Sequence, residues 1–404
     1  MTDAALRGAP APLGRTEFVA LMAMLAATVA FGIDAMLPAL PVIGDALSPG
    51  DPARAQLVIT AFVLGMGAGT FLAGPLSDAV GRRPVIVGGA VLYAVGAALA
   101  GTAQSMEAML AGRALQGLGA AGPRVATVAL VRDLHAGPAM ARIMSFVMMT
   151  FSLVPAVAPL IGAGLIALAG WRGVFGAFVA FAAVSAAWLM LRQPETLPPA
   201  ARRPLSARRI GGAVREVFSR RVVVLAIGVQ TLAFAMLFTV LSTVAYVFDG
   251  VFDRAASFPF WFGGVAVVAG TGSLLNARLV GTFGLRSIVL CAMGAQAALA
   301  AAAAVASAQG LGGAPFFALY LAWTTSVFFL AGLTMANVNA LAMEPLPHIA
   351  GLAASVIGAV ATVGAVAVAA PIGMRFDGTV TPVAAGIALC AALGAGLTAA
   401  MPRR

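Results

Sequence analysis

The sequence contains no lysine, and only 9% of its 404 residues are charged. A soluble protein of this length carries about a quarter charged residues on its water-facing surface. Hydrophobic residues make up 61% of this chain, and its mean hydropathy is +1.01. These values exclude an ordinary soluble protein, and we conclude that most of the molecular surface faces lipid.

Cysteine and histidine are also scarce, with two residues of each in the whole chain. Cys291 and Cys390 are far apart in apolar runs, and His135 and His348 fall singly in expected loops. The sequence therefore predicts no disulfide framework, no metal site and no cofactor. Without lysine there is no Gly-x-x-x-x-Gly-Lys phosphate loop, so we expect no direct use of ATP.

Long aliphatic blocks are the main feature that is present. Blocks of this length predict transmembrane α-helices, whereas a membrane β-barrel would show short alternating segments. Cutting the chain at charges and Gly/Pro clusters predicts an all-α membrane protein with twelve transmembrane helices. The expected helices are 18–40, 55–76, 84–104, 107–131, 139–168, 171–191, 222–248, 258–280, 285–308, 314–342, 349–374 and 381–400.

One polar connection divides these helices into two sets of six. Residues 192–221 contain eight arginines and two glutamates, which is too much charge to cross a bilayer. We therefore predict two six-helix bundles, 1–191 and 222–404, joined by this basic linker. A weak internal match supports duplication, because Gly81 and Arg83 align with Gly284 and Arg286.

The distribution of arginine predicts the orientation of the chain. A basic linker belongs in the cytoplasm, and an even number of helices on each side then places both termini there. Most arginines fall on this expected inner side; the four expected outside are Arg54, Arg172, Arg254 and Arg375. The net charge of +10 is therefore a membrane-topology signal, and we expect no nucleic-acid partner.

The most specific motif is the loop "GPLSDAVGRRP" at 74–84, between the second and third expected helices. It resembles the signature cytoplasmic loop of the major facilitator superfamily, in which charge contacts between helices stabilise the outward-facing state. One departure is Ala79, where the family usually has a basic residue. The matching positions are Gly74, Asp78, Gly81, Arg82 and Arg83. The alternative interpretation is an ordinary positive-inside loop.

The fourth expected helix contains "RALQGLGAAGPR", with Arg113 inside the membrane and two glycines, Gly117 and Gly119, suited to close helix packing. This resembles the Arg-x-x-x-Gly-x-Gly motif of the drug:proton antiporters of the superfamily, whose arginine takes part in proton coupling. Snorkelling to the interface is the alternative for Arg113. For Arg124, expected near the cytoplasmic end, a structural or gating role is at least as plausible as transport chemistry.

The fifth expected helix matches the antiporter motif only in part. It keeps Pro159 and Gly162 but has Val154, Ala158 and Ala163 at other motif positions. Two prolines still predict a bent helix.

Asp34 is an acid inside the first apolar run, where a charge costs roughly 2.5–3.5 kcal/mol on insertion scales. The stretch "DAMLPALP" resembles transporters of the bicyclomycin-resistance subfamily, and the resemblance extends over nearly the whole chain. At 1.5 Å per residue, Asp34 and Arg113 both lie roughly 9 Å below the outer boundary. Two opposite charges at one depth are a candidate proton-coupling pair. A static ion pair or a boundary cap is the alternative.

A few polar residues of the second half are candidates for a substrate cavity. For each of them, a helix–helix hydrogen bond is the favoured interpretation over substrate binding. They are Gln230 and Tyr246, and in the tenth expected helix Asn337 and Asn339.

These observations, with the resemblance, predict a proton-coupled efflux transporter of the bacterial inner membrane. It would export small lipophilic compounds as a monomer by drug:proton antiport, exchanging drug for protons by alternating access. The nearer alternative is the same fold carrying a metabolite such as an amino-acid derivative, nucleoside or sugar, by export or uptake. A membrane-embedded enzyme or sensor is a distant alternative, because no cluster of catalytic side chains occurs within the helices.

Overall fold

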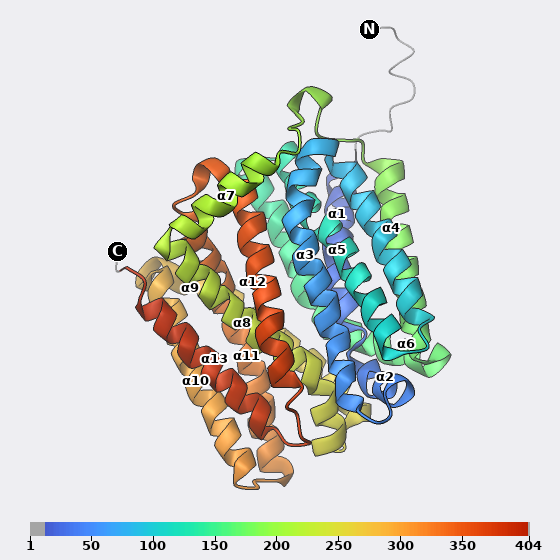
Figure 1. Cartoon of the computed structure of the whole chain (residues 1–404), viewed down its shortest axis with the longest axis vertical. Coiled ribbons are helices and arrows are strands. Elements are labelled where there is room, and N and C mark those ends of the chain that lie inside the picture. Colours follow the sequence, from blue (N-terminus) through green and yellow to red (C-terminus); the bar gives the residue numbers. More distant parts are fainter. Residues whose placement is uncertain (1–12, 403–404) are drawn as a thin grey trace.

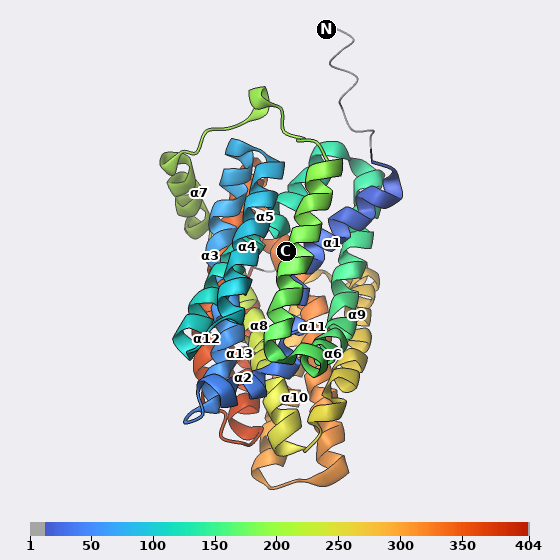
Figure 2. The same ribbon diagram turned by 90° about the vertical axis from the view of Figure 1, so that its right-hand side faces the viewer.

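The computed structural model describes residues 13–402, and the helices dominate this part of the chain, which contains no strand. The helices stand side by side, with a short helix, α7, at one end, where it packs against α12 and α8 (Figures 1 and 2). We call this end the linker side and the opposite end the far side. The outermost residues of both predicted bundles, 1–12 and 403–404, lie outside the described residues, and so do the chain ends whose side of the membrane the arginines predict.

The first half begins with α1, which ends at Asp34 and passes through a short helical turn into α2. Pro38 and Pro41 lie in these two short elements, which is where proline is tolerated at a helix start. The elements are α1 (Arg15–Asp34), η1 (Leu37–Ala39), α2 (Leu40–Leu47), η2 (Pro52–Gln56), α3 (Leu57–Val80), α4 (Arg82–Gly101), α5 (Met106–Leu134) and α6 (Gly137–Arg192).

The long element α6 is two helices in one. Its backbone leaves helical geometry at Ala169 and Gly170, and Gly170 has φ of 66°, which glycine adopts without strain. The two arms on either side of this break correspond to the predicted helices 139–168 and 171–191. A positive-φ glycine therefore replaces the expected loop between them.

The second half follows the linker, which contains a short turn and α7. A π-helical turn extends α8 at its end. The elements are η3 (Pro199–Ala201), α7 (Ala207–Ser219), α8 (Arg221–Tyr246), η4 (Val247–Val251), η5 (Ala255–Ser257), α9 (Phe258–Phe283), α10 (Leu285–Ala308), α11 (Gly313–Met343), η6 (Pro347–Ile349), α12 (Ala350–Gly373) and α13 (Thr381–Ala399).

Twelve membrane crossings follow from these elements. Ten segments of the described chain are long and apolar enough to span a bilayer, with the two arms of α6 taken together as one of the ten. The remaining crossing is α5, whose hydropathy is reduced by charged residues inside and at the ends of the helix. The prediction of an all-α, twelve-helix membrane protein is confirmed.

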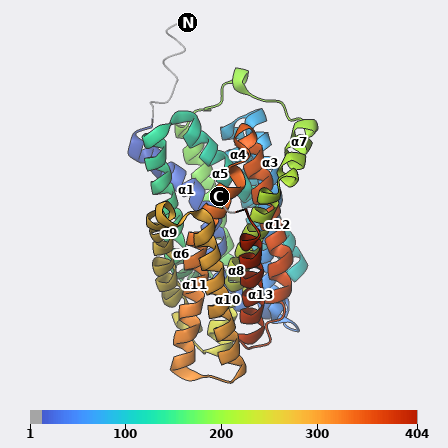
Figure 3. The same ribbon diagram turned by 90° about the vertical axis from the view of Figure 1, so that its left-hand side faces the viewer.

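The helices form two six-helix bundles. Helices α1, α3, α4, α5 and α6 pack together, and α8 to α13 pack together. Between the bundles, α3 lies along α12 and α6 lies along α9. Figure 3 shows the second bundle from the side, with α10, α11 and α13 in front. We propose that the bundles are residues 1–191 and 222–404, because the connection between them lies at one end of both and contributes no membrane-spanning helix of its own.

The two halves use the same turn after their second helix. Gly81 and Gly284 both have positive φ, 116° and 74°, and nearly equal ψ, 163° and 158°. Arg83 donates to the carbonyl of Met190 at the end of α6, and Arg286 donates to carbonyls at the end of α13. Each arginine therefore holds the last helix of its own bundle, as the aligned positions of a duplicated unit should.

Candidate functional site

Asp34 is the last residue of α1 and is only 4% exposed. The chain turns there, because the helix gives way to the proline-containing turn at Leu37–Ala39. Within residues 13–402 no ion pair includes Asp34. A carboxyl that is buried and has no counter-charge among residues 13–402 therefore lies at the far-side end of α1.

Arg113 is completely buried in α5. Its guanidinium donates to the carbonyl oxygens of Gly32 at 3.0 Å and Val58 at 3.3 Å, and to Oε1 of Gln116 at 2.6 Å. The guanidinium carbon also lies 4.4 Å from the centroid of the Phe62 ring, a cation–π distance. Three helices, α1, α3 and α5, therefore share one cation.

The structure brings Asp34 and Arg113 to the same region but forms no ion pair between them. Arg113 reaches the backbone of Gly32, two residues before Asp34. A Cβ at Gly32 would lie 2.6 Å from Oη of Tyr93, so this side of α1 faces α4. Successive helical residues rotate by about 100°, and Asp34 consequently points to nearly the opposite side of α1. Matching depth alone did not define the contact.

Two further residues complete this buried cluster and were not among the predicted site residues. Gln116 and Tyr93 are both 0% exposed, and among residues 13–402 the Gln116 Nε2 and Tyr93 Oη atoms have no hydrogen-bond partner. Gln116 is three residues after Arg113, a spacing that places both on neighbouring positions of one helix face. That spacing was the available signal for Gln116, whereas only packing reveals Tyr93.

The motif glycines bring helices into backbone contact around this cluster. A Cβ on Gly117 would overlap the Phe62 carbonyl in α3, and one on Gly119 would overlap the backbone of Tyr93 in α4. In α6, a Cβ on Gly162 would overlap the Ala35 carbonyl, directly after Asp34. Pro159 is buried one turn earlier in the same helix. These residues position α1 and α5 relative to each other.

The loop motif forms a second polar cluster, on the linker side. Arg82 pairs with Asp78 at 2.5 Å and with Asp133, at the end of α5, at 2.9 Å. Glu195 in the linker accepts the backbone N–H groups of Arg82 and Arg83, each at 3.0 Å. Sequence reasoning predicted the loop but missed its two distant partners, Asp133 and Glu195.

Gly74 has a different function from the charged residues of that loop. A Cβ there would overlap Oγ of Ser355 in α12. Gly74 thus lets the two bundles approach closely on the linker side.

The candidate cavity residues of the second half do not form one group. Asn337 and Asn276 exchange amide hydrogen bonds at 2.7 and 3.2 Å, joining α11 to α9. Asn339 is exposed, and Gln230 is buried with an unpaired Oε1 atom. Asn337 therefore forms a helix–helix hydrogen bond, which is one of the two interpretations that the sequence offered for it.

Tyr246 lies at the contact between the bundles on the far side. Its hydroxyl donates to the carbonyl of Leu40 at 2.9 Å, and α8 also packs against η1 and α2. Beside this contact, Gln56 of the first bundle lies against Gly373 and Ser242 of the second. The two bundles therefore meet on the far side, whereas α5 and α11 pack against each other much less.

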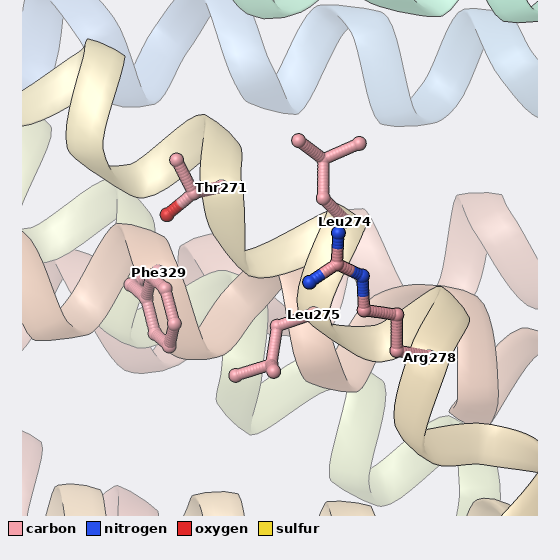
Figure 4. Close-up of a pocket in the computed structure, with 5 residues that line it drawn as sticks. All are labelled: Thr271, Leu274, Leu275, Arg278 and Phe329. Atoms are coloured by element: carbon pink, nitrogen blue, oxygen red, sulfur yellow. The ribbon is translucent and has the colours of Figure 1, made fainter.

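A groove of about 330 Å³ lies elsewhere, on the outer surface of α9 and α11. Thr271, Leu274, Leu275 and Arg278 extend from α9, and Phe329 from α11 (Figure 4). Leu274 is 68% exposed, so this groove faces the surroundings of the protein. None of the predicted site residues lines it.

No group of three or more potential metal ligands occurs within residues 13–402. Cys291 is exposed and Cys390 is buried, and both thiols are free. The polar chemistry of the described helices thus rests on the clusters around Asp34, Arg113 and Arg82.

Twelve crossings in two similar bundles, with buried charges between the helices, define a multi-pass membrane transporter of small molecules rather than an enzyme. The chain belongs to the Major Facilitator Superfamily, whose family model matches residues 21–370.

Several relatives match over most of their length. A protein named "Bicyclomycin resistance protein homolog" from Haemophilus influenzae is 27% identical over 89% of this chain and 90% of its own. A protein named "Multidrug resistance protein MdtL" from Shewanella oneidensis is 28% identical over 81% of each chain. A "Chloramphenicol resistance protein" from Pseudomonas aeruginosa is 40% identical, over 41% of this chain and 39% of its own.

Solved structures show the same fold at low identity. The peptide transporter POT in complex with sulfate superposes with a TM-score of 0.75 and 13% identity over 99% of this chain and 97% of its own. The D-xylose-proton symporter superposes with a TM-score of 0.72 and 16% identity over 94% of this chain and 97% of its own.

Proposed function

We propose that this protein is a proton-coupled drug efflux transporter that exports small lipophilic compounds. The observation that carries the proposal is Asp34, a buried carboxyl without an ion-pair partner in the described chain. An ionisable group at such a position is costly in a membrane protein and is usually functional. The names of the relatives from Haemophilus influenzae and Pseudomonas aeruginosa support drugs as the substrate class.

The proposed orientation places the linker side in the cytoplasm and the chain in a bacterial inner membrane. The eight arginines of 192–221 support this, because cytoplasmic loops attract excess basic residues. The contact between Tyr246 and Leu40 then lies on the outer side of the membrane. We expect a monomer, since a single chain contains both bundles between which substrate and protons are exchanged.

In the proposed cycle, drug and proton compete. A drug that enters from the cytoplasm favours loss of the proton from Asp34, and rocking of the bundles exposes the site to the outside. Release of the drug favours reprotonation there. Each proton returning inward gains about 2.3 kcal/mol per 100 mV, together with the pH-gradient contribution.

Arg113 acts differently from the expected direct ion pair in this scheme. It holds the backbone of Gly32 through a hydrogen bond of 3.0 Å, and so fixes the part of α1 that carries Asp34. A change in the charge of Asp34 is then transmitted to α5 through α1. Tyr93 and Gln116 pack beside this link and would respond to the same movement.

The test is Asp34→Asn in everted membrane vesicles, with Asp45→Asn as the matched control because Asp45 is an exposed acid in α2. An imposed inside-acid gradient should drive chloramphenicol into vesicles with the original protein or the control. Asp34→Asn should abolish gradient-driven uptake while drug exchange without a gradient continues. Gradient-driven uptake at the original level in Asp34→Asn would contradict proton coupling through this residue.

A further inference from the structure

Arg124 is a cation that neither the proton-coupling cluster nor the loop cluster uses. It lies in α5 about 16 Å from Arg113 towards the linker side, at 1.5 Å per residue. Its Nη1 atom is buried, and it has no hydrogen-bond partner in the described chain. The rest of the side chain is partly exposed, so a small molecule can reach it.

Thr127 adds a second unpaired donor beside it. The side chain is 2% exposed, and its hydroxyl has no hydrogen-bond partner. Two other buried helical threonines, Thr70 and Thr334, donate to the carbonyl four residues earlier, at 2.8 Å, whereas Thr239 and Thr324 resemble Thr127 in having an unpaired hydroxyl among residues 13–402. Residues three apart on a helix are neighbours, so the guanidinium of Arg124 and this hydroxyl lie on the same face of α5.

None of the ion pairs between residues 13–402 includes Arg124. Asp78 and Asp133 on the linker side both pair with Arg82. Glu17 pairs with Arg192, and Glu195 accepts backbone N–H groups of its neighbours and of the loop. The acids near this end of the first bundle are therefore engaged with other donors.

The surroundings of the two donors are apolar. Residues one and two turns further along α5, Leu130 and Val131, pack with Leu21 and Leu25 of α1. On the other side of the site, Ala120 is completely buried. An anion that enters with apolar substituents of its own would stabilise a guanidinium in such surroundings.

We propose that Arg124 and Thr127 form an oxyanion-binding site for the carboxylate of amphiphilic organic acids. The guanidinium and the hydroxyl donate to the carboxylate oxygens, and the apolar part of the ligand contacts the side chains around them. This deepens the proposed efflux function by adding organic anions to its substrates, and it rests on that function only for transport. The site itself is a property of the first bundle.

Binding of 1-naphthoate and of its neutral isostere 1-naphthamide tests the site. Calorimetric titration of the purified full-length protein should give a Kd about tenfold lower for naphthoate, since hydrogen bonds to charged groups are the stronger ones. Arg124→Gln should remove this preference, and Arg124→Lys should keep part of it. Thr127→Val should weaken naphthoate binding about threefold to tenfold, whereas binding of naphthamide stays unchanged.

Two matched controls separate the site from general effects. Thr70→Val removes a buried threonine whose hydroxyl is already paired, and Arg278→Gln removes an exposed arginine of the groove in Figure 4. Both should retain the preference for naphthoate. Thermal melting of every variant establishes that it is folded before its Kd is compared.

Equal binding of the two compounds by the original protein, or an unchanged preference in Arg124→Gln, would overturn the proposal. Displacement of naphthoate by 0.1 M chloride but not gluconate would also overturn it, because the ligand would then be an inorganic anion. Failure of chloramphenicol export in the original protein would instead reject the efflux function. It would leave the discrimination between naphthoate and naphthamide intact.

Discussion

The two bundles share a fold but differ in the polar groups that they bury. The charged residues buried in the described chain, Asp34, Arg82 and Arg113, all belong to the first bundle. The second bundle buries amides and hydroxyls at comparable depth, including Gln230, Asn276, Gln296, Asn337 and Thr362. One half contains the ionisable chemistry, and the other contains neutral polar contacts.

The difference follows from the cost of burying charge. A buried ion needs hydrogen bonds or an oppositely charged partner. Removing such a partner leaves an uncompensated buried charge, which destabilises the folded protein. The first bundle supplies such hydrogen bonds and partners through backbone carbonyls at Gly32 and Val58 and through the Arg82 cluster. Burying a pair of hydrogen-bonded neutral amides costs much less free energy than burying a charge. The second bundle can therefore join its helices through such pairs without adding an ionisable group.

The largest effect is expected when the arginine contacts of the two corresponding loops are removed, one loop in each bundle. Arg82→Ala should lower the free energy of unfolding by about 3 kcal/mol, because it leaves Asp133 and Asp78 without their cation. Arg286→Ala should cost about 1 kcal/mol, since it removes only hydrogen bonds to the end of α13. Chemical denaturation in detergent measures both.

Equal costs for the two variants would show that the loops are equivalent and that the charge asymmetry has no effect on stability. Arg82→Lys should recover only part of the loss, because lysine cannot reproduce the two separate contacts that the guanidinium makes.

A smaller effect is expected from the backbone contact beside Asp34. Gly162→Ala should destabilise the protein by about 2 kcal/mol, because the new methyl group overlaps the carbonyl of Ala35. Gly164→Ala is the control, with no atom within 4 Å of its Cβ position, and should stabilise α6 slightly through higher helix propensity. The melting temperatures should therefore shift in opposite directions; shifts in the same direction would argue against the close contact of α6 with α1.

The smallest effect concerns the second bundle. Asn337→Leu should cost about 1 kcal/mol, because it leaves Asn276 buried without its partner. The double variant Asn276→Leu/Asn337→Leu should recover most of this loss, since no unpaired amide remains. If the double variant has normal stability but much lower drug transport, Asn276 and Asn337 have a role in substrate transport. That result would contradict the view that the second bundle contains only structural polar contacts.

Much of the fold could be predicted because membrane-spanning helices are recognisable in a sequence as long runs of apolar residues. Each long apolar run became a crossing, and the charge-rich α5 was still recognised from its position between two polar boundaries. The break between the fifth and sixth helices was predicted at 169–170, where the backbone leaves helical geometry at Ala169 and Gly170, but the sequence did not show that a glycine with positive φ makes it. A positive φ is a backbone property that hydropathy does not register.

The sequence by itself determined the membrane class, the twelve crossings, the depth of Asp34 and Arg113 and the glycines that bring the helices together. Only the tertiary structure decided what each side chain faces. It directed Arg113 to the carbonyl of Gly32, joined Arg82 to Asp133 and Glu195, and left Arg124 and Thr127 without partners. The physical reason is that residue spacing gives depth along a helix, whereas contact depends on rotation about its axis and on neighbours distant in sequence.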